Sequence, residues 1–320
     1  MIPHNERLIF ENLFVLELAN NHWGDLERGL KIVRDFAAVA RNNSVRAAIK
    51  LQFRDVDSFI HPSYKGAQTR YIKKTEDTEL TTSDFKILID EITECGCIPM
   101  ATPFDEISVD LCQALDLPII KVASSDITSW TLLDKISSLN RPVIISTGGA
   151  TEKDIDDCVF FFEQKDIPLA INHCVSLYPS EDSELELNQI DYLKEKYPNH
   201  VIGFSSHEMT DWKNSMLISY GKGVRTWERH IDIEGQVSKY CSLPHQIDEW
   251  FKAFHKAQEM CGGSVSSRRC VSSKERKYLD ELVRGVYAKN DLEKGTAISQ
   301  DDIFLAIPLQ DGQLSCREIQ

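Results

Sequence analysis

The sequence predicts an α/β fold, a (β/α)₈ TIM barrel, from the alternation of two kinds of segment. Short apolar runs alternate with longer amphipathic stretches from residue 13 to about residue 260. Eight alternations over roughly 245 residues match the size and rhythm of such a barrel. A doubly wound sheet also alternates, but a glycine-rich phosphate turn follows its first strand. Here the first apolar run ends in ELANNH, which lacks those glycines, so a barrel is favoured.

The predicted strands are apolar runs of about four to eight residues, as expected when both faces of a parallel sheet are buried. They are Leu13–Leu18, Ala47–Phe53, Ile98–Ala101, Ile119–Val122, Val143–Ser146, Leu169–Asn172, Val201–Phe204 and Val224–Trp227.

The predicted helices lie between these strands and repeat apolar residues at helical spacing, as in the stretch 26–40. Several have start signals, in which a short polar side chain precedes the first apolar residue. These signals are Thr82-Ser83-Asp84 before Phe85, Thr151-Glu152 before Ile155, and Asp211 before Trp212.

The chain is predicted to contain two domains joined by a linker. The barrel is assigned to residues 1–260, and the small, polar and basic segment CGGSVSSRRCVSSKER places a linker at 261–283. Residues 284–320 contain short apolar runs separated by Lys294-Gly295, which predicts two strands and a turn. This β-rich module is too small to be stable without packing on something else.

Composition excludes several classes of partner. The net charge of −14 repels nucleic acid and anionic membranes, which bind clustered Lys and Arg. No apolar run approaches the roughly 20 residues of a membrane span, and the N-terminus does not resemble a secretory signal. The nine cysteines are an odd number without disulfide-like spacing. They predict reduced thiols and a cytoplasmic location.

Polar side chains stand where nearly every predicted strand ends. In a barrel these ends converge on one mouth, where active sites are built. Burying such groups costs several kcal/mol unless they are paired or bind a ligand. The positions are Glu17, Lys50 and Gln52, Thr102, Lys121 with Ser124 and Asp126, Ser146, His173 with Ser176 and Tyr178, Ser205 with His207, and Glu228 with His230.

Two lysines, Lys50 and Lys121, lie within apolar strands. One interpretation is an anion site, in which both ammonium groups and nearby hydroxyls bind a small dianion. A second is internal salt bridges to Glu17 or Glu228. A third is a Schiff-base lysine, as in aldolases.

His207 and His230 follow the seventh and eighth strands, which are neighbours in a closed barrel. Two imidazoles with nearby oxygen donors suit a divalent metal, Mn²⁺ or Mg²⁺, with positions left open for substrate. The alternative is that each histidine is a hydrogen-bonded core residue.

The strings that hold these residues resemble the sialic acid synthase family, which includes N-acetylneuraminate, legionaminate and pseudaminate synthases. They occur in the family's order and cover residues 13 to about 235, and the segment from Arg284 resembles the start of the family's antifreeze-like (SAF) domain. The strings are LELANNHWGD, IKLQF, ATPFDEISVDLCQAL, IIKVASSDITSWTLL, RPVIISTGGAT, HCVSLYPS, GFSSHE and WERHID.

The resemblance implies a transferase that condenses phosphoenolpyruvate with an open-chain sugar aldehyde and releases phosphate by C–O cleavage. It implies that His207 and His230 hold the metal, and that Glu17 positions or deprotonates the attacking water. Glu17, Lys50, Lys121 and His230 would be catalytic, and the enzyme would be a homodimer. The residues implied to bind phosphoenolpyruvate or the sugar are Lys50, Gln52, Thr102, Lys121, Ser124, Asp126, Ser146, Ser176, Tyr178 and Ser205.

Three departures from the family pattern concern the acceptor side. Ser238 stands where an acidic residue is usual, Ser176 replaces an asparagine, and Ile307 replaces an arginine that contacts the sugar. The tail is also about half a domain short of the family pattern, so a partial domain is expected. These departures leave three hypotheses: a synthase with a non-standard aldehyde acceptor, a weakened relative that binds a sugar or phosphate ligand, and an aldolase that uses Lys121.

Overall fold

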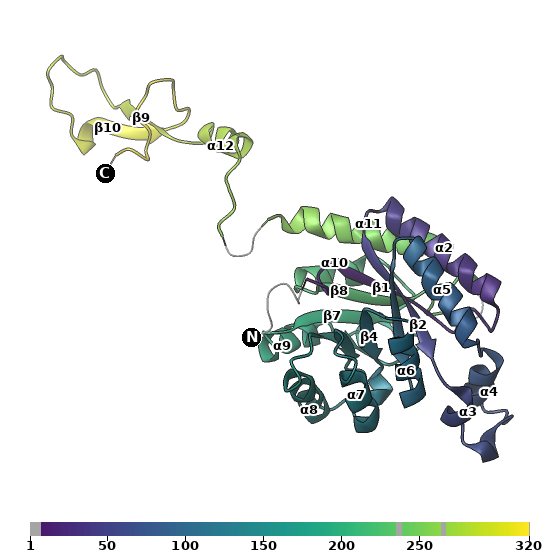
Figure 1. Cartoon of the computed structure of the whole chain (residues 1–320). Helices are drawn as coiled ribbons and strands as arrows, with labels where there is room; N and C mark the ends of the chain where they lie inside the picture. The colour runs from purple at the N-terminus through teal and green to yellow at the C-terminus, as the bar shows by residue number, and fades with distance from the viewer. Residues whose placement is uncertain (1–7, 235–238, 264–266, 320) are drawn as a thin grey trace. The chain divides into compact units, whose positions relative to one another are not determined.

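The first of two compact units is a closed barrel, and it confirms the predicted fold (Figure 1). The computed structural model describes residues 8–234, 239–263 and 267–319, and the units are Met1–Cys261 and Gly262–Gln320. Eight parallel strands pair in chain order, and β1 also pairs with β8. They are β1 Leu13–Ala19, β2 Arg46–Phe53, β3 Ile98–Pro103, β4 Ile119–Val122, β5 Val143–Ser146, β6 Leu169–Cys174, β7 Val201–Ser206 and β8 Thr226–His230.

The barrel interior changes from apolar to polar along the strands. Because side chains alternate between faces, residues two apart point to the same side. Val15 lies in the inner apolar cluster, and Glu17 stands two residues further along β1. The same step leads from Ile119 to Lys121. An apolar floor therefore underlies a layer of polar groups at the carboxyl ends of the strands. The floor residues are Phe10, Leu13, Val15, Ala48, Met100, Ile119, Ile144, Ala170 and Val201.

Helices surround the barrel and cover the outward faces of the strands (Figure 1). Phe14 of β1 shows how this outer core packs: its ring stacks on Trp227 with 5.2 Å between ring centres and meets Phe254 edge-on at 4.9 Å. The helices are α2 Leu26–Asn42, α3 Val56–Phe59, α4 Arg70–Asp77, α5 Thr82–Glu94, α6 Glu106–Ala114, α7 Trp130–Ser137, α8 Glu152–Glu163, α9 Asn188–Lys196, α10 Asn214–Gly221 and α11 Pro244–Cys261.

Two sequence predictions near the seventh and eighth strands were wrong in detail. Asp211 does not start a helix at Trp212, because its carboxylate accepts from the Lys213 amide at 2.5 Å and the chain bends until α10 begins at Asn214. The strand predicted to begin at Val224 begins at Thr226 instead. The Val224 amide closes the end of α10 by donating to the Ser219 carbonyl at 3.0 Å.

Thr81 caps the N-terminus of α5, and its replacement by alanine is expected to lower the free energy of unfolding by about 1 kcal/mol. Thr81 Oγ1 accepts from the Asp84 amide at 3.1 Å, and the Asp84 carboxylate accepts from the Thr81 amide at 3.0 Å. Urea denaturation followed by tryptophan fluorescence measures the change, because all five tryptophans lie between residues 23 and 250. Thr69→Ala is the control, since Thr69 begins α4 without a side-chain cap. Equal losses in both variants would contradict the prediction.

The second unit contains a two-stranded antiparallel sheet, β9 Gly285–Ala288 and β10 Ile303–Ala306. The predicted turn at Lys294-Gly295 is present, and Gly295 has a φ of 98°, which favours glycine. The segment predicted as linker contains a helix, α12 Ser273–Asp280, whose N-terminus is capped by Ser272.

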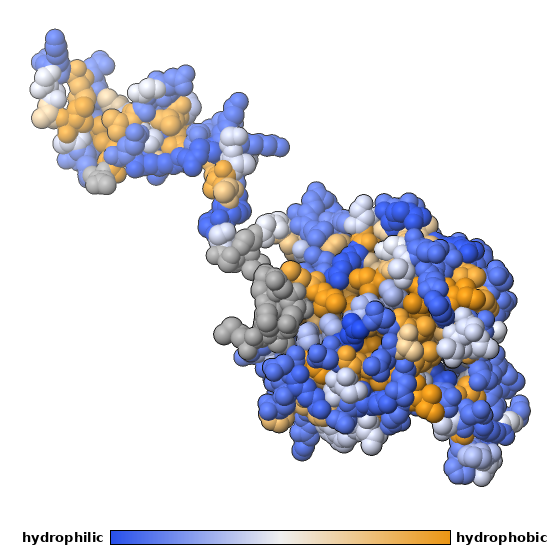
Figure 2. Space-filling view, viewed as in Figure 1, coloured by the Kyte–Doolittle hydropathy of each residue, from blue (hydrophilic) through white to orange (hydrophobic). Residues whose placement is uncertain are grey.

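The surface of the barrel unit carries hydrophilic residues along its periphery, with hydrophobic residues nearer its centre (Figure 2). Within the described ranges, no helix is both long and apolar enough to cross a membrane.

Candidate active site

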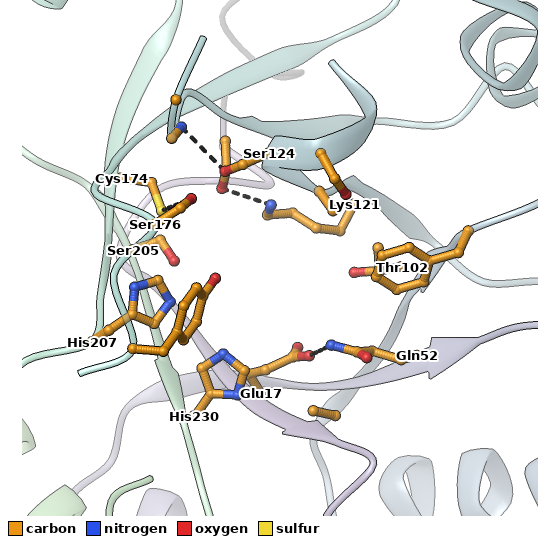
Figure 3. Close-up of a pocket in the computed structure, with 18 of the residues that line it drawn as sticks. Glu17, Gln52, Thr102, Lys121, Ser124, Cys174, Ser176, Ser205, His207 and His230 are labelled. Carbon is orange, nitrogen blue, oxygen red and sulfur yellow. Dashed lines mark hydrogen bonds between the residues drawn. The ribbon is translucent and has the colours of Figure 1, made fainter. Parts of the chain in front are cut away.

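The carboxyl ends of the strands open into a cavity of about 900 Å³. All eight strands contribute polar side chains to it, and Figure 3 shows Lys121 and Ser124 on one side and Glu17, Gln52 and His230 on the other. The predicted site residues that line the cavity are Glu17, Lys50, Gln52, Thr102, Lys121, Ser124, Ser146, Ser176, Tyr178, Ser205, His207 and His230.

Lys50 is buried between two carboxylates, so the salt-bridge interpretation holds for this lysine. Its ammonium contacts the Glu17 carboxylate and lies 3.6 Å from Glu228 Oε1. It also donates to Thr102 Oγ1 at 3.0 Å. Burial alone lowers the pKa of Lys50, but the two carboxylates outweigh burial and raise it. Lys50 is therefore a fixed positive charge.

The two carboxylates beside Lys50 have different proton affinities. Burial raises the pKa of Glu17, and the attraction of Lys50 offsets this only in part. Burial also acts on Glu228, but Lys50 and Lys121 together lower its pKa below the ordinary value. Gln52 Nε2 donates to Glu17 Oε1 at 2.8 Å and orients the carboxylate. Neighbouring acids with separated pKa values are typical of acid–base sites, and Glu17 is the group suited to exchange a proton.

Lys121 has hydroxyl and carbonyl partners instead of a carboxylate. Its ammonium donates to Ser146 Oγ at 2.7 Å and to the Val122 carbonyl at 2.8 Å, and it forms no ion pair in the described part of the chain. Burial lowers the pKa of Lys121. Ser124 lies nearby and accepts from the Gly148 amide at 3.1 Å. This wall offers positive charge and hydroxyls without a competing carboxylate, which suits an oxyanion.

His207 and His230 face each other across the end of β7 and β8, with 5.5 Å between ring centres. His207 Nδ1 lies 3.0 Å from the Val175 carbonyl. Because a carbonyl can only accept, Nδ1 carries the proton and Nε2 keeps its lone pair. Burial lowers the pKa of His207 to about 4 and that of His230 well below its ordinary value. Both imidazoles are therefore neutral, as metal ligands must be.

The family model for the NeuB family matches residues 38–266, which is more than half of the chain. The chain belongs to the NeuB family. This confirms the resemblance to sialic acid synthases stated from the sequence.

Characterised and solved relatives of this NeuB family member extend over most of its length. It is 27% identical to N,N'-diacetyllegionaminic acid synthase of Campylobacter jejuni, over 93% of this chain and 91% of that protein. A crystal structure described as spore coat polysaccharide biosynthesis protein E of Chromobacterium violaceum is 35% identical, with a TM-score of 0.91 over 97% of this chain and 93% of that one. N-acetylneuraminic acid synthetase of Leptospira borgpetersenii shares the fold, with 24% identity and a TM-score of 0.74 over 84% and 91% of the two chains.

The residues of this NeuB family member that can hold a metal are the two histidines. The Nδ1 atom of His230 is buried and has no hydrogen-bond partner, which leaves a ring nitrogen for a ligand. Among the described residues, no group of three or more His, Cys, Asp or Glu side chains forms a complete metal site. The donor set fits a metal with two protein nitrogens whose other positions are filled by water or substrate.

Three residues singled out from the sequence are not placed against the cavity by the described part of the structure, each for a different reason. Asp126 is not among the described lining residues, although Ser124 and Ser125 are, and its carboxylate accepts from Ser125 Oγ at 2.8 Å. Ser238 lies outside the described residues. Ile307 belongs to the second unit, where its side chain is exposed.

Several lining residues were missed by the sequence reasoning. Tyr240 packs edge-on against His230 with 5.1 Å between ring centres and closes the histidine side of the cavity. Arg54 stands two residues beyond Gln52, so the period of two along β2 was a signal that could have found it. Arg70 and Lys74 lie on α4, a segment without apolar periodicity.

Proposed function

We propose that the chain is a phosphoenolpyruvate-dependent synthase that joins the donor to an aldehyde sugar and releases phosphate by C–O cleavage. The observation that carries the proposal is the placement of Lys121, hydrogen-bonded to Ser146, opposite the neutral imidazoles of His207 and His230 in one cavity. One wall suits an oxyanion, and the other suits a metal and an aldehyde oxygen. The names of relatives, such as N,N'-diacetyllegionaminic acid synthase, support a sugar acid as the product class.

In this proposal the donor lies across the two buried lysines. Lys121 and the hydroxyls of Ser124 and Ser146 bind one acidic group, and Lys50 with Thr102 faces the other. Gln52 and Ser205 complete the donor pocket. These donors are already oriented in a buried site, so they need little rearrangement as charge moves during the reaction.

The bond changes follow from the enol phosphate. The methylene carbon of phosphoenolpyruvate forms a bond to the aldehyde carbon, and the donor's second carbon becomes cationic. Water adds to this cation, and Glu17 takes the proton that the water loses. Phosphate then leaves with the bridging oxygen and takes up the proton of the new hydroxyl, which becomes the keto group. The former aldehyde oxygen takes a proton and becomes a hydroxyl. Burial raises the pKa of Glu17, which makes its carboxylate a stronger base toward the proton of the attacking water.

A divalent metal, Mn²⁺ or Mg²⁺, held by His207 and His230 would act as a Lewis acid toward the aldehyde oxygen. Tyr178 lies against the same two residues, with 4.0 Å between its ring centre and that of His207. It forms a wall for the acceptor beside the metal ligands.

A lysine aldolase is the second candidate, because burial lowers the pKa of Lys121 and so favours the free amine. Borohydride reduction with pyruvate separates the two functions, since only a Schiff base becomes a permanent adduct.

The proposed function predicts aldose-dependent phosphate release from phosphoenolpyruvate in the presence of Mn²⁺. In water with isotopically heavy oxygen, C–O cleavage leaves the released phosphate unlabelled and places the label in the new keto acid. Labelled phosphate would contradict the proposed route. Absence of release with every aldose, from protein that binds Mn²⁺, would overturn the function itself.

A further inference from the structure

The mouth of the cavity carries three cations that the donor site does not use. Arg54 follows the end of β2, and Arg70 and Lys74 lie one helical turn apart on α4. All three line the cavity. The chain has a net charge of −14, so a local gathering of positive charge runs against its overall composition.

None of these three cations forms an ion pair within the described ranges, whereas their neighbour Lys73 does. Lys73 pairs with Asp77 at 2.8 Å, one turn along the same helix. Arg70 and Lys74 have the same spacing but carry like charges, which destabilises a helix by a few tenths of a kcal/mol. A local arrangement that costs stability without a partner is typical of a binding site.

Arg54 is held in a fixed orientation. Its guanidinium lies over the Phe104 ring at 3.7 Å and donates to Gln52 Oε1 at 3.0 Å. Burial lowers the pKa of Arg54 to about 10, which reflects the loss of water around the charge. A guanidinium that is stacked, desolvated and free of carboxylate partners is prepared for an oxyanion.

Helix α4 is attached to the barrel at its C-terminal end. Asn20 Nδ2, just after β1, donates to Thr78 Oγ1 at 2.8 Å, and that hydroxyl donates to the Lys74 carbonyl at 2.7 Å. Gly24 allows the close approach, because a Cβ there would lie 2.9 Å from the Asp77 carbonyl. These contacts fix the position of Lys74 relative to β1.

The cations belong to the histidine side of the cavity. Lys74 is held beside the end of β1 through Thr78 and Asn20. On β1, Glu17 is the register partner of His230 on β8. Arg54 contacts Gln52, the member of the donor pocket that Figure 3 places on the same side as His230 and across from Lys121. The cluster therefore faces the space for the acceptor, apart from the Lys121 wall.

We propose that Arg54, Arg70 and Lys74 bind an anionic group, a phosphate or a carboxylate, on the aldose acceptor. This inference rests on the proposed function, because it assigns the substrate class of the same site. A neutral sugar would leave three positive charges at the mouth without a counterion. An acidic group remote from the aldehyde would neutralise them while the aldehyde points toward the histidines.

Turnover with matched aldoses tests the inference: mannose, mannose 6-phosphate and mannuronate, each with phosphoenolpyruvate and Mn²⁺. We expect an acidic aldose to have a lower KM than mannose. Comparison of mannose 6-phosphate with mannuronate shows whether the site prefers a phosphate or a carboxylate. Lys74→Met and Arg70→Gln should each reduce the preference for the acidic aldose over mannose by about 10- to 100-fold. Lys73→Met is the matched control, because it removes an adjacent charge already paired with Asp77.

Calorimetry keeps the inference separate from the proposed function. The same aldoses are titrated into enzyme saturated with 2-phosphoglycerate, which has the donor's acidic groups but no enol carbon. The inference is supported if the enzyme binds an acidic aldose more tightly than mannose and Lys74→Met weakens that binding. Such binding supports the inference even when no turnover is seen, whereas the absence of turnover counts against the proposed synthase. Equal binding of acidic and neutral aldoses overturns the inference. So does a raised KM for phosphoenolpyruvate in Lys74→Met with mannose, which would assign the cation to the donor.

Discussion

Lys121→Met is expected to reduce phosphoenolpyruvate turnover by at least about 100- to 1,000-fold, the usual cost of removing one oriented donor from a developing negative charge. The same variant should be as stable as the native protein or more stable. The Lys121 ammonium is buried without a carboxylate partner in the described residues, and a methionine of similar length does not carry that desolvation cost. Activity and stability are therefore expected to change in opposite directions.

Lys50→Met provides the contrast, because Lys50 neutralises Glu17 and Glu228. Its loss leaves the Glu17 carboxylate buried without its contacting cation and weakens the neutralisation of Glu228, and breaking a buried pair in this way costs about 3–5 kcal/mol. Both variants should lose turnover, but only Lys50→Met should lose stability. Urea denaturation followed by tryptophan fluorescence measures both proteins. Equal losses of stability in the two variants would contradict the assignment of a carboxylate partner to Lys50 but not to Lys121.

The stability of Lys121→Met relative to the native protein should also depend on pH. Folding lowers the pKa of Lys121 below its ordinary value of 10.5, so the unfolded chain binds more protons than the folded one in the window below 10.5. Native stability therefore rises with pH in that window, and the advantage of Lys121→Met should shrink as pH approaches 10.5. A constant difference across the window would mean that the ammonium is not desolvated.

His230→Ala is expected to weaken Mn²⁺ binding by at least about 100-fold. Removal of a residue that only hydrogen-bonds to a metal ligand already lowers metal affinity by up to about 100-fold, and removal of the ligand itself should lower it no less. Turnover should fall with it. Calorimetric titration of Mn²⁺ into the protein measures binding without relying on activity. The unpaired Nδ1 of the native residue makes this variant structurally mild, since its removal also removes a buried polar atom without a partner.

His245→Ala is the matched control for the metal prediction. His245 is exposed on α11 and does not line the cavity, so its removal should leave Mn²⁺ affinity unchanged. If His230→Ala binds Mn²⁺ as the native protein does, then the two imidazoles do not form the metal site.

The barrel could be predicted in detail because buried parallel strands leave a clear record in the sequence. Both faces of β4 and β5 are buried, and the bounds of these strands, Ile119–Val122 and Val143–Ser146, agree with the predicted runs. Polar groups at strand ends were equally visible, since Glu17 and Lys121 each interrupt an apolar run. Barrel geometry then brings such residues together.

The mouth of the cavity was harder to predict because its residues follow no period. Asp126 occupies a family position, yet the short turn Ser124–Asp126 leaves it off the cavity lining. Arg70 and Lys74 can be recognised as cavity-lining residues only when α4 is known to lie at the mouth of the cavity. Local sequence cannot give that placement, because it depends on the distant contact between Asn20 and Thr78.

The attachment of α4 by its C-terminal end has a consequence for the choice of acceptor. Most of the proposed donor groups stand on the strands of the barrel, as Lys50 does on β2 and Lys121 on β4. Arg70 and Lys74 lie on α4, which the Thr78 hydroxyl links to Asn20 at the end of β1. A change within this segment is therefore expected to alter which acceptor is bound while leaving the proposed donor site unchanged.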